Sequence, residues 1–182
     1  VNTVVNNNGK LIGYNTDWIG IVDPLKKMID LKNKKVALIG AGGASRAAIF
    51  GLLHEGVNIA IFNRTIEKAE ELAKEFNCEA ENIENIEKIK DFDIIINATS
   101  IGMKPNENLT PISKEYLLKK HIIFDCIYNP LETKLIKEAR EVGCRTVLGI
   151  EMLLYQGVKQ FEYYVGREAP IEVMREALMR NL

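Results

Sequence analysis

A glycine-rich run near position 40 is the part of the sequence best suited to bind an anion. Between Val36 and Ser45, four apolar residues lead into three glycines, as in a buried parallel strand that turns directly into a helix. Gly40 permits the tight turn, Gly42 lets backbone approach a pyrophosphate, and Gly43 keeps the first helical turn slim. The free N–H groups and the positive dipole end of that helix would face the anion. Ser45 departs from the strict dinucleotide pattern, so a plain strand–turn–helix connection stays open on this run alone.

A cation follows the next strand-like run, where a dinucleotide fold meets the adenosine ribose. Asn63 lies 21 residues after Gly42, at about the spacing where an acid would bind the ribose 2′-hydroxyl of NAD. That acid is absent, and Arg64 offers a planar cation able to bind a 2′-phosphate in bidentate fashion. Thr65 could cap the next helix, and Lys68 follows on its first turn. Together they predict NADP rather than NAD, with ordinary solvated charges as the alternative.

An aspartate close to the N-terminus allows two interpretations. Thr16 or Asp17 can cap a helix whose apolar positions continue to Ile29, and Pro24 within it predicts a kink or a restart. From residue types alone, an N-cap is as good an interpretation of Asp17 as a chemical role.

A hairpin precedes this helix. Two short strand-like runs, Val1–Val5 and Leu11–Tyr14, flank Asn8-Gly9, whose residues both accept positive φ. A two-stranded hairpin is marginal by itself, so its partner strands are expected elsewhere. With its abrupt start, the sequence is expected to be a fragment of a longer protein.

The elements that must position these groups alternate regularly along the chain. Strands are predicted at 36–39, 58–62, 92–97, 122–125 and 145–149, with helices at 66–76 and 133–142 and a short polar stretch at 84–91. This alternation predicts an α/β fold with a Rossmann-like, doubly wound parallel sheet. Helices at 150–161 and 171–182 add nothing to that sheet and are expected to pack on something else.

Composition excludes several classes of function. The chain has 182 residues, is 47% hydrophobic and carries a net charge of -1, so it can form a packed core and gives no reason to propose nucleic acid or an acidic membrane as a partner. No apolar run approaches the roughly 20 residues of a membrane span. The three cysteines lack metal-ligand spacing, which predicts no metal site and reduced thiols in a cytoplasmic protein.

Seven motifs in one order give the chain a specific resemblance to the shikimate dehydrogenase family, from its first residue to near its last. They are Val1-Asn-Thr-Val4, Gly13-Tyr-Asn-Thr-Asp17, Gly40-Ala-Gly-Gly-Ala-Ser-Arg-Ala47, Asn63-Arg-Thr65, Asn97-Ala-Thr-Ser100 with Gly102-Met103, Asp125-x-x-Tyr128-x-Pro130 with Thr133, and Gly149-x-x-Met-Leu153 with Gln156-Gly157. The resemblance implies that residues 1–16 end a substrate domain, 17–149 form the NADP-binding domain, and 150–182 pack back on the substrate domain. The family's first domain, with its catalytic lysine, has no counterpart in this sequence.

The family's reaction is the reversible, NADPH-dependent reduction of 3-dehydroshikimate to shikimate in aromatic amino-acid biosynthesis. By resemblance, Asp17 is the catalytic aspartate beside the missing lysine, and this polypeptide alone is expected to be inactive. The substrate residues implied are Asn2, Asp17, Tyr128 and Gln156. The cofactor residues implied are Gly40, Ala41, Gly42, Gly43, Ala44, Asn63, Arg64, Thr65, Lys68, Thr99, Ser100, Cys126 and Gly149. Without the resemblance, Tyr128 and Gln156 would be read as core residues.

Three alternatives remain at this point. The first is an NAD-dependent quinate/shikimate dehydrogenase, against which Arg64 argues. The second is a cofactor-binding module without turnover, and the third is a methyltransferase, which usually has an acid at the end of the second strand. The expected partner is the small-molecule substrate, with no nucleic acid and no membrane, and a homodimer is left open.

Overall fold

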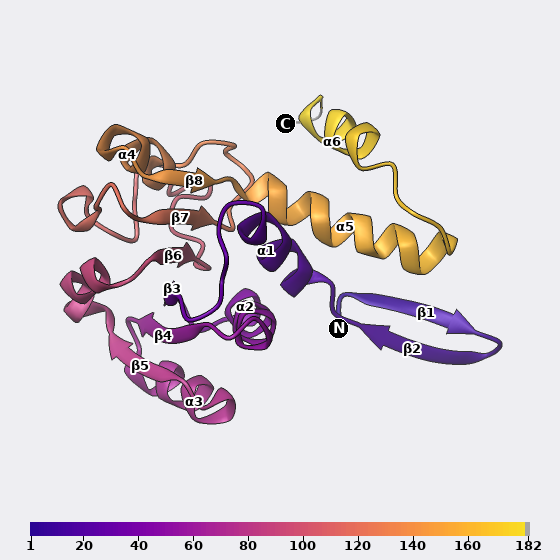
Figure 1. The fold of residues 1–182 in the computed structure, drawn as a ribbon, viewed down its shortest axis with the longest axis horizontal. Coiled ribbons are helices and arrows are strands. Elements are labelled where there is room, and N and C mark those ends of the chain that lie inside the picture. The colour runs from indigo at the N-terminus through magenta and orange to yellow at the C-terminus, as the bar shows by residue number, and fades with distance from the viewer. Residues whose placement is uncertain (181–182) are drawn as a thin grey trace.

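The structure, a computed structural model, describes residues 1–180, and in that range six strands form one parallel sheet (Figure 1). Its strand order is β5-β4-β3-β6-β7-β8. Their bounds are β3 Lys35–Ile39, β4 Asn58–Asn63, β5 Glu79–Asn82, β6 Ile94–Asn97, β7 Ile122–Asp125 and β8 Arg145–Val147. The order runs outward in both directions from β3 and β6, which is the doubly wound topology with a ligand crevice at the switch between those strands. The predicted fold class is confirmed.

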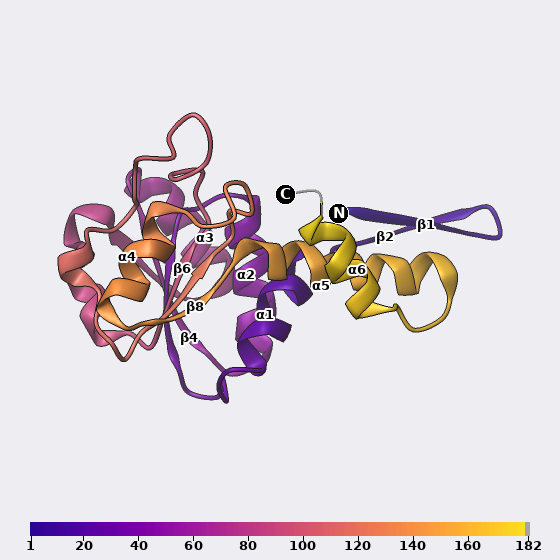
Figure 2. The ribbon, with the colours of Figure 1, turned by 90° about the horizontal axis from the view of Figure 1, so that it is seen from above.

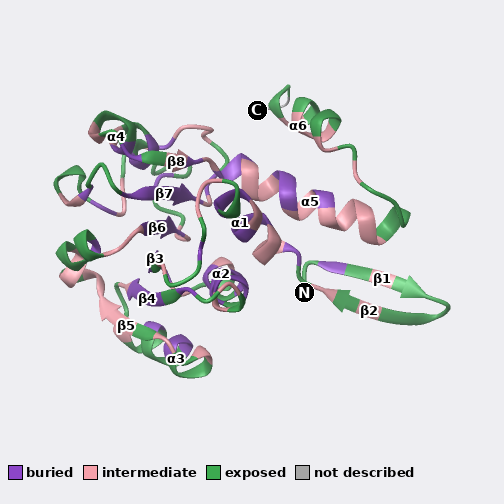
Figure 3. Ribbon diagram, in the orientation of Figure 1, coloured by how far each residue is buried: buried purple, intermediate pink, exposed green. Residues whose placement is uncertain are grey.

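Alternating side chains of the strands build two apolar cores, one on each face of the sheet. Val36 and Leu38 of β3 belong to one core, and Ala37 and Ile39 to the other. The first is covered by α1 (Asp17–Lys26), α2 (Gly43–His54) and α3 (Ile66–Phe76), and the second by the 3₁₀ segments η1 (Ile83–Asp91) and η2 (Lys114–Tyr116) and by α4 (Lys134–Val142). Both faces of β6 and β7 are therefore buried (Figure 3). Near-continuous apolar strands of this kind are what a parallel sheet requires.

The N-terminal hairpin forms a separate antiparallel pair, β1 (Thr3–Asn7) with β2 (Lys10–Tyr14). Its turn residues Asn8 and Gly9 have φ of 51° and 88°, so the predicted turn is confirmed. Together with part of α5 (Gly149–Val165), the hairpin extends away from the sheet (Figures 1 and 2). Tyr14 stacks on Tyr163 of α5 with ring centroids 4.2 Å apart, which ties the hairpin to that helix.

The C-terminal helices form a small core of their own. Leu154 and Val158 of α5 pack against Met174 and Leu178 on α6 (Ile171–Met179). The expected helix at 171–182 is thus confirmed as far as Met179, and positions 181–182 lie outside the described residues. In residues 1–180, no helix combines the length and the apolar character needed to cross a membrane.

One strand of the sheet was not predicted. β5 pairs with β4 at the edge of the sheet, yet its sequence Glu-Ala-Glu-Asn has no apolar alternation. An edge strand can form through backbone hydrogen bonds to its single neighbour and needs little side-chain burial. The polar stretch that follows it is the 3₁₀ segment η1, whose Ile89 is fully buried.

The kink expected in the first helix is wrong. α1 continues through Pro24 and ends two residues later at Lys26, so Ile29 lies beyond it. Because Pro24 is close to the C-terminal end, its missing N–H removes one hydrogen bond without interrupting a long helix. Other ends differ from prediction by one or two residues: β6 begins at Ile94, and the last strand stops at Val147 because Gly149 already begins α5.

Replacing Gly149 by alanine is expected to lower the free energy of unfolding by at least about 2 kcal/mol. A Cβ at this position would overlap the carbonyl of Ile127 and lie 2.8 Å from the carbonyl carbon of Cys126, so backbone would have to move. Gly157→Ala, within the same helix, meets only Met174 Cε at 3.6 Å and should be neutral or stabilising by up to about 1 kcal/mol. Urea unfolding of both variants tests this, and equal effects would contradict the close approach.

Candidate cofactor and substrate site

The glycine turn after β3 has the backbone conformation that its sequence predicts. Gly40 has a φ of +107°, and a Cβ there would come within 2.9 Å of the Thr99 methyl group. Gly42 and Gly43, by contrast, face open space, with no atom within 4 Å of an added Cβ. The turn therefore leaves room beside the N-terminus of α2 for a bulky anion.

Ser45, the departure from the strict pattern, closes the turn from inside. Its side chain is buried, and the hydroxyl donates to the carbonyl oxygen of Gly40 at 2.8 Å. The Ser45 hydroxyl oxygen also accepts from the N–H of Gly42 at 3.3 Å. Serine thus replaces a small residue without filling the anion space, and it adds two hydrogen bonds that hold the turn's shape.

Groups from separate strands line a cavity of about 310 Å³ beside this turn. Gly40 after β3, Asn63 and Arg64 at the end of β4, and Thr99 and Ser100 after β6 are among its lining residues. Within residues 1–180, Arg64 forms no ion pair, so its guanidinium is available to a ligand. A cavity that joins an open glycine turn to an unpaired guanidinium fits a pyrophosphate with an added phosphate.

The neighbouring residues of that motif differ from expectation in detail. Asn63 donates its side-chain N–H to the carbonyl oxygen of Thr65 at 2.8 Å, which folds the Asn63 amide back over the strand end. Thr65 occupies the N-cap position of α3, but its hydroxyl makes no capping hydrogen bond, so the predicted capping contact is wrong. Thr65 and Lys68 are not among the residues that line the cavity.

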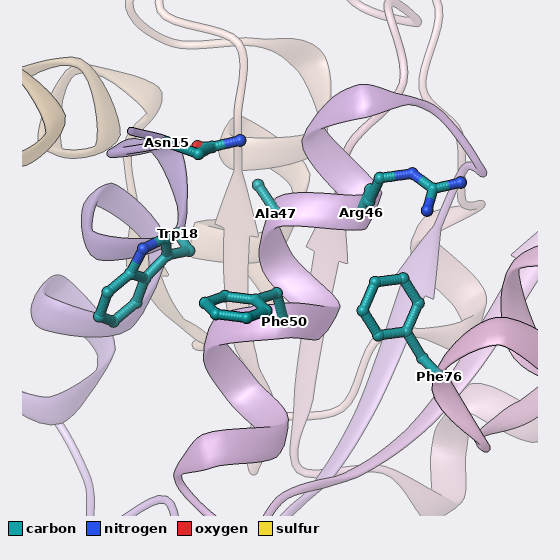
Figure 4. A pocket seen from close by; sticks show the side chains of 6 residues that line it. All are labelled: Asn15, Trp18, Arg46, Ala47, Phe50 and Phe76. Atoms are coloured by element: carbon teal, nitrogen blue, oxygen red, sulfur yellow. The ribbon is translucent and has the colours of Figure 1, made fainter. Parts of the chain in front are cut away.

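A second arginine, Arg46, follows the glycine turn in the sequence, but it already forms an ion pair. It pairs with Glu75 and lies over the Phe76 ring, 5.7 Å from the ring centroid. Figure 4 shows it at a different cavity, on the outer side of α2, together with Trp18 and Phe50. Arg46 therefore does not compete with Arg64 for the crevice.

A cavity of about 460 Å³ continues the crevice on the other side of Thr99 and Ser100. Ala44, Cys126 and Tyr128 line it together with those two residues. Burial, with the negative charges of Asp125 and Asp17, raises the pKa of the Cys126 thiol, so this thiol is neutral. Gly149 lies behind this wall, in contact with the backbone of Cys126.

A polar cluster joins the hairpin to α1. The side-chain N–H of Asn2 donates to Asp17 Oδ1 at 2.8 Å and to Thr16 Oγ1 at 3.0 Å, while its Oδ1 accepts from the N–H of Thr16 at 2.9 Å. Thr16 Oγ1 also donates to Gln156 Oε1 of α5, at 3.5 Å. Asp17 is thus the first residue of α1 rather than its N-cap, and its carboxylate is held by an amide from another element.

Thr16 was not predicted as a site residue. It is fully buried at the N-cap position, yet it makes no capping hydrogen bond because its hydroxyl is directed to Asn2 and Gln156. The one sequence signal for it was its place between Asn15 and Asp17 in a polar run. Tyr128 lies apart from this cluster, in the wall of the larger cavity, and is 47% exposed.

Behind the crevice lies a buried carboxylate, Asp125 at the end of β7. It accepts hydrogen bonds from the side chains of Asn97, at 3.1 Å, and Thr133, at 2.6 Å, and from the N–H of Ile127 at 3.1 Å. Burial raises the pKa of Asp125 to about 6, although these donors act in the opposite direction. Among the residues described, no cluster of histidine, cysteine or acidic side chains could hold a metal ion.

These features define the class of protein: a doubly wound nucleotide-binding domain whose crevice suits a phosphorylated dinucleotide. The sequence model described as shikimate / quinate 5-dehydrogenase matches residues 24–140, and that of the shikimate 5'-dehydrogenase C-terminal domain matches 149–179. The chain belongs to the shikimate dehydrogenase family. The predicted family membership is thereby confirmed.

Individual relatives agree with this assignment. The shikimate dehydrogenase (NADP(+)) of Bacillus cereus is 44% identical over all of this chain and 69% of its own length. That of Methanocaldococcus jannaschii is 47% identical over all of this chain and 68% of its own. A crystal structure of a shikimate dehydrogenase in complex with NADP+ superposes with a TM-score of 0.90 at 40% identity, covering 98% of this chain and 65% of that one. The chain therefore spans about two thirds of the length of these relatives.

Asp125 is expected to make folding stability depend on pH with a defined sign. Its pKa of about 6 in the folded protein exceeds the ordinary value of 3.8, so the folded state holds the proton more tightly than the unfolded state. The contribution of protonated Asp125 to folding stability is fully present below about pH 4 and is lost as pH rises through about 6. The stability of the wild type relative to Asp125→Asn should therefore fall by about 2 kcal/mol between about pH 4 and pH 7. Urea unfolding of both proteins across this range measures it, and a constant difference would contradict it.

Proposed function

We propose that this chain supplies the NADP-binding domain of a shikimate dehydrogenase, which reduces 3-dehydroshikimate to shikimate. The observation that carries the proposal is the cavity shared by the open glycine turn and the unpaired Arg64. The NADP named for the curated relatives and the NADP+ bound in the similar crystal structure support the choice of cofactor. The remaining one third of the relatives' length is where the family's catalytic lysine is expected.

The chain's residues divide the work of binding between the two cavities. Gly40 to Ala44 and the N-terminus of α2 would hold the pyrophosphate, and Arg64 with Lys68 would hold the 2′-phosphate. Thr99, Ser100 and Cys126 would wall the nicotinamide half and keep water from it. NADPH, when bound, supplies the hydride.

The polar cluster would serve the substrate. Asn2 donates a hydrogen bond to one carboxylate oxygen of Asp17, which orients that carboxylate, and Thr16 links Asn2 to Gln156. In the family's reaction an aspartate lies next to the lysine that gives a proton to the developing alkoxide. We infer that Asp17 has this role and that Asn2, Gln156 and Tyr128 contact the substrate.

The proposal includes a division of the chain. Residues 1–16 would end the substrate domain, 17–149 would form the NADP-binding domain, and the helices from 150 onward would pack back on the substrate domain. The separate sheet of the hairpin and the separate core of α5 with α6 support this division. The homodimer and the cytoplasmic location stay predictions.

Calorimetric titration with NADPH and NADH tests the cofactor assignment. The wild type should prefer NADPH, and Arg64→Gln should weaken NADPH binding about tenfold while leaving NADH binding unchanged, because only NADPH carries the 2′-phosphate. Lys68→Gln should reduce the preference for NADPH over NADH in the same way, but by a smaller factor. Lys74→Gln is the matched control, since Lys74 is an exposed cation in the last turn of the same helix. An unchanged NADPH to NADH preference in Arg64→Gln would contradict the assignment.

The 182-residue polypeptide is expected to bind NADPH without oxidising it when 3-dehydroshikimate is added. Asp17 and its partners can orient a substrate, but no residue of this chain corresponds to the proton-donating lysine of the family. Following NADPH absorbance with and without substrate tests this, with an active shikimate dehydrogenase as the assay control. Steady turnover by the polypeptide would show that its own residues complete the catalytic site.

A further inference from the structure

Two loops that wall the larger cavity are each held by a buried polar side chain at the end of a strand. Asn97 ends β6 and Asp125 ends β7, and the two are register partners in the sheet. Both side chains are fully buried, as is that of Thr133. Polar groups buried this deeply are stabilising only when their hydrogen bonds are satisfied, and here each has a partner.

Asn97 holds the loop after β6 through local hydrogen bonds. Its Oδ1 accepts from the N–H of Thr99 at 3.0 Å and from the Thr99 hydroxyl at 2.7 Å, and its Nδ2 donates to the carbonyl oxygen of Ile101 at 3.2 Å. These bonds set the place of Thr99, whose methyl group touches the space beside Gly40. The loop after β6 is therefore fixed against the glycine turn.

Asp125 holds the loop after β7 at both of its ends. The N–H of Ile127 donates to Oδ1 at the start of the loop, and the hydroxyl of Thr133 donates to Oδ2 at its end. Thr133 Oγ1 also accepts from the N–H of Ile136 at 3.3 Å, which begins α4. The segment between these anchors contains Tyr128, which lines the larger cavity, and Cys126 lines it just before Ile127.

We propose that Asp125 is a positioning residue for cofactor binding, which acts through Ile127 and Thr133 on the loop after β7 that walls the nicotinamide half. This inference rests on the proposed function. Asp125 is fully buried behind the cavity and is not among its lining residues, so its effect on a ligand must pass through that loop. The adenosine half depends instead on the glycine turn and on Arg64, which come from β3 and β4. Thr99 keeps its own bonds to Asn97 when Asp125 or Thr133 changes.

The test compares two ligands that share the adenosine half. NADPH reaches both cavities, whereas adenosine 2′,5′-bisphosphate has the 2′-phosphate and no nicotinamide. By calorimetry, Thr133→Val and Asp125→Asn should each weaken NADPH binding about tenfold, the cost of one hydrogen bond to a charged group. Binding of the bisphosphate should stay within about twofold, since none of its contacts depends on the loop after β7.

Thr133→Ser is the matched control because it keeps the hydroxyl that reaches Asp125. Its NADPH affinity should lie within about twofold of that of the wild type, whereas a role in packing alone would spare Thr133→Val, which keeps the shape of the side chain, and weaken Thr133→Ser, which loses the methyl group. If Asp125→Asn does not fold, the Thr133 pair still gives the comparison.

The failing outcomes can be told apart. Equal weakening of both ligands, or no weakening of NADPH, would overturn the positioning role while leaving the proposed function in place. A wild type that binds neither ligand would overturn the proposed function and this inference with it.

Discussion

The structure depends on a close backbone approach at the start of α5. Gly149 lies so near the carbonyl of Ile127 that any side chain at this position would displace one of them. The contact sets the direction of α5, which carries Gln156 to the hydrogen bond with Thr16. It also supports the backbone of Cys126, in the wall of the larger cavity. The close approach that Gly149 allows therefore fixes the position of the cofactor crevice relative to the polar cluster around Asp17.

Charged groups follow a consistent division between surface and interior. The ion pairs, such as Lys26 with Glu55 at 2.9 Å, are partly exposed and contribute little to stability. Arg64 is left without an ion pair within the described part of the chain, and it faces a cavity. Asp125 is the opposite case, a carboxyl group taken out of water and compensated by three hydrogen bonds. The guanidinium of Arg64 is thus available to a ligand, whereas the buried carboxyl group of Asp125 holds loops in place through its hydrogen bonds.

Most of the fold could be predicted because apolar periodicity reports burial on both faces of a parallel sheet. β5 could not, since its side chains carry no such signal and its formation depends on the exposed edge of β4. The kink at Pro24 was wrongly predicted because the cost of proline depends on how much helix follows it, and here only two residues do. The expected start of β6 was early because Phe92 is apolar and packs on the core although it is the C-cap residue of η1, and the last strand stopped early because Gly149 begins α5.

The sequence by itself determined the glycine turn, the cation at the end of the second strand and the family, because residue types at short spacing dictate local conformation and chemistry. Only the tertiary structure decided which groups meet. It brought Asn2 to Asp17 and, among residues 1–180, left Arg64 without an ion pair while Arg46 pairs with Glu75. Such contacts join residues far apart in the chain, and their geometry is set by how strands and helices pack. The spacing of residue types along the chain does not specify these long-range contacts.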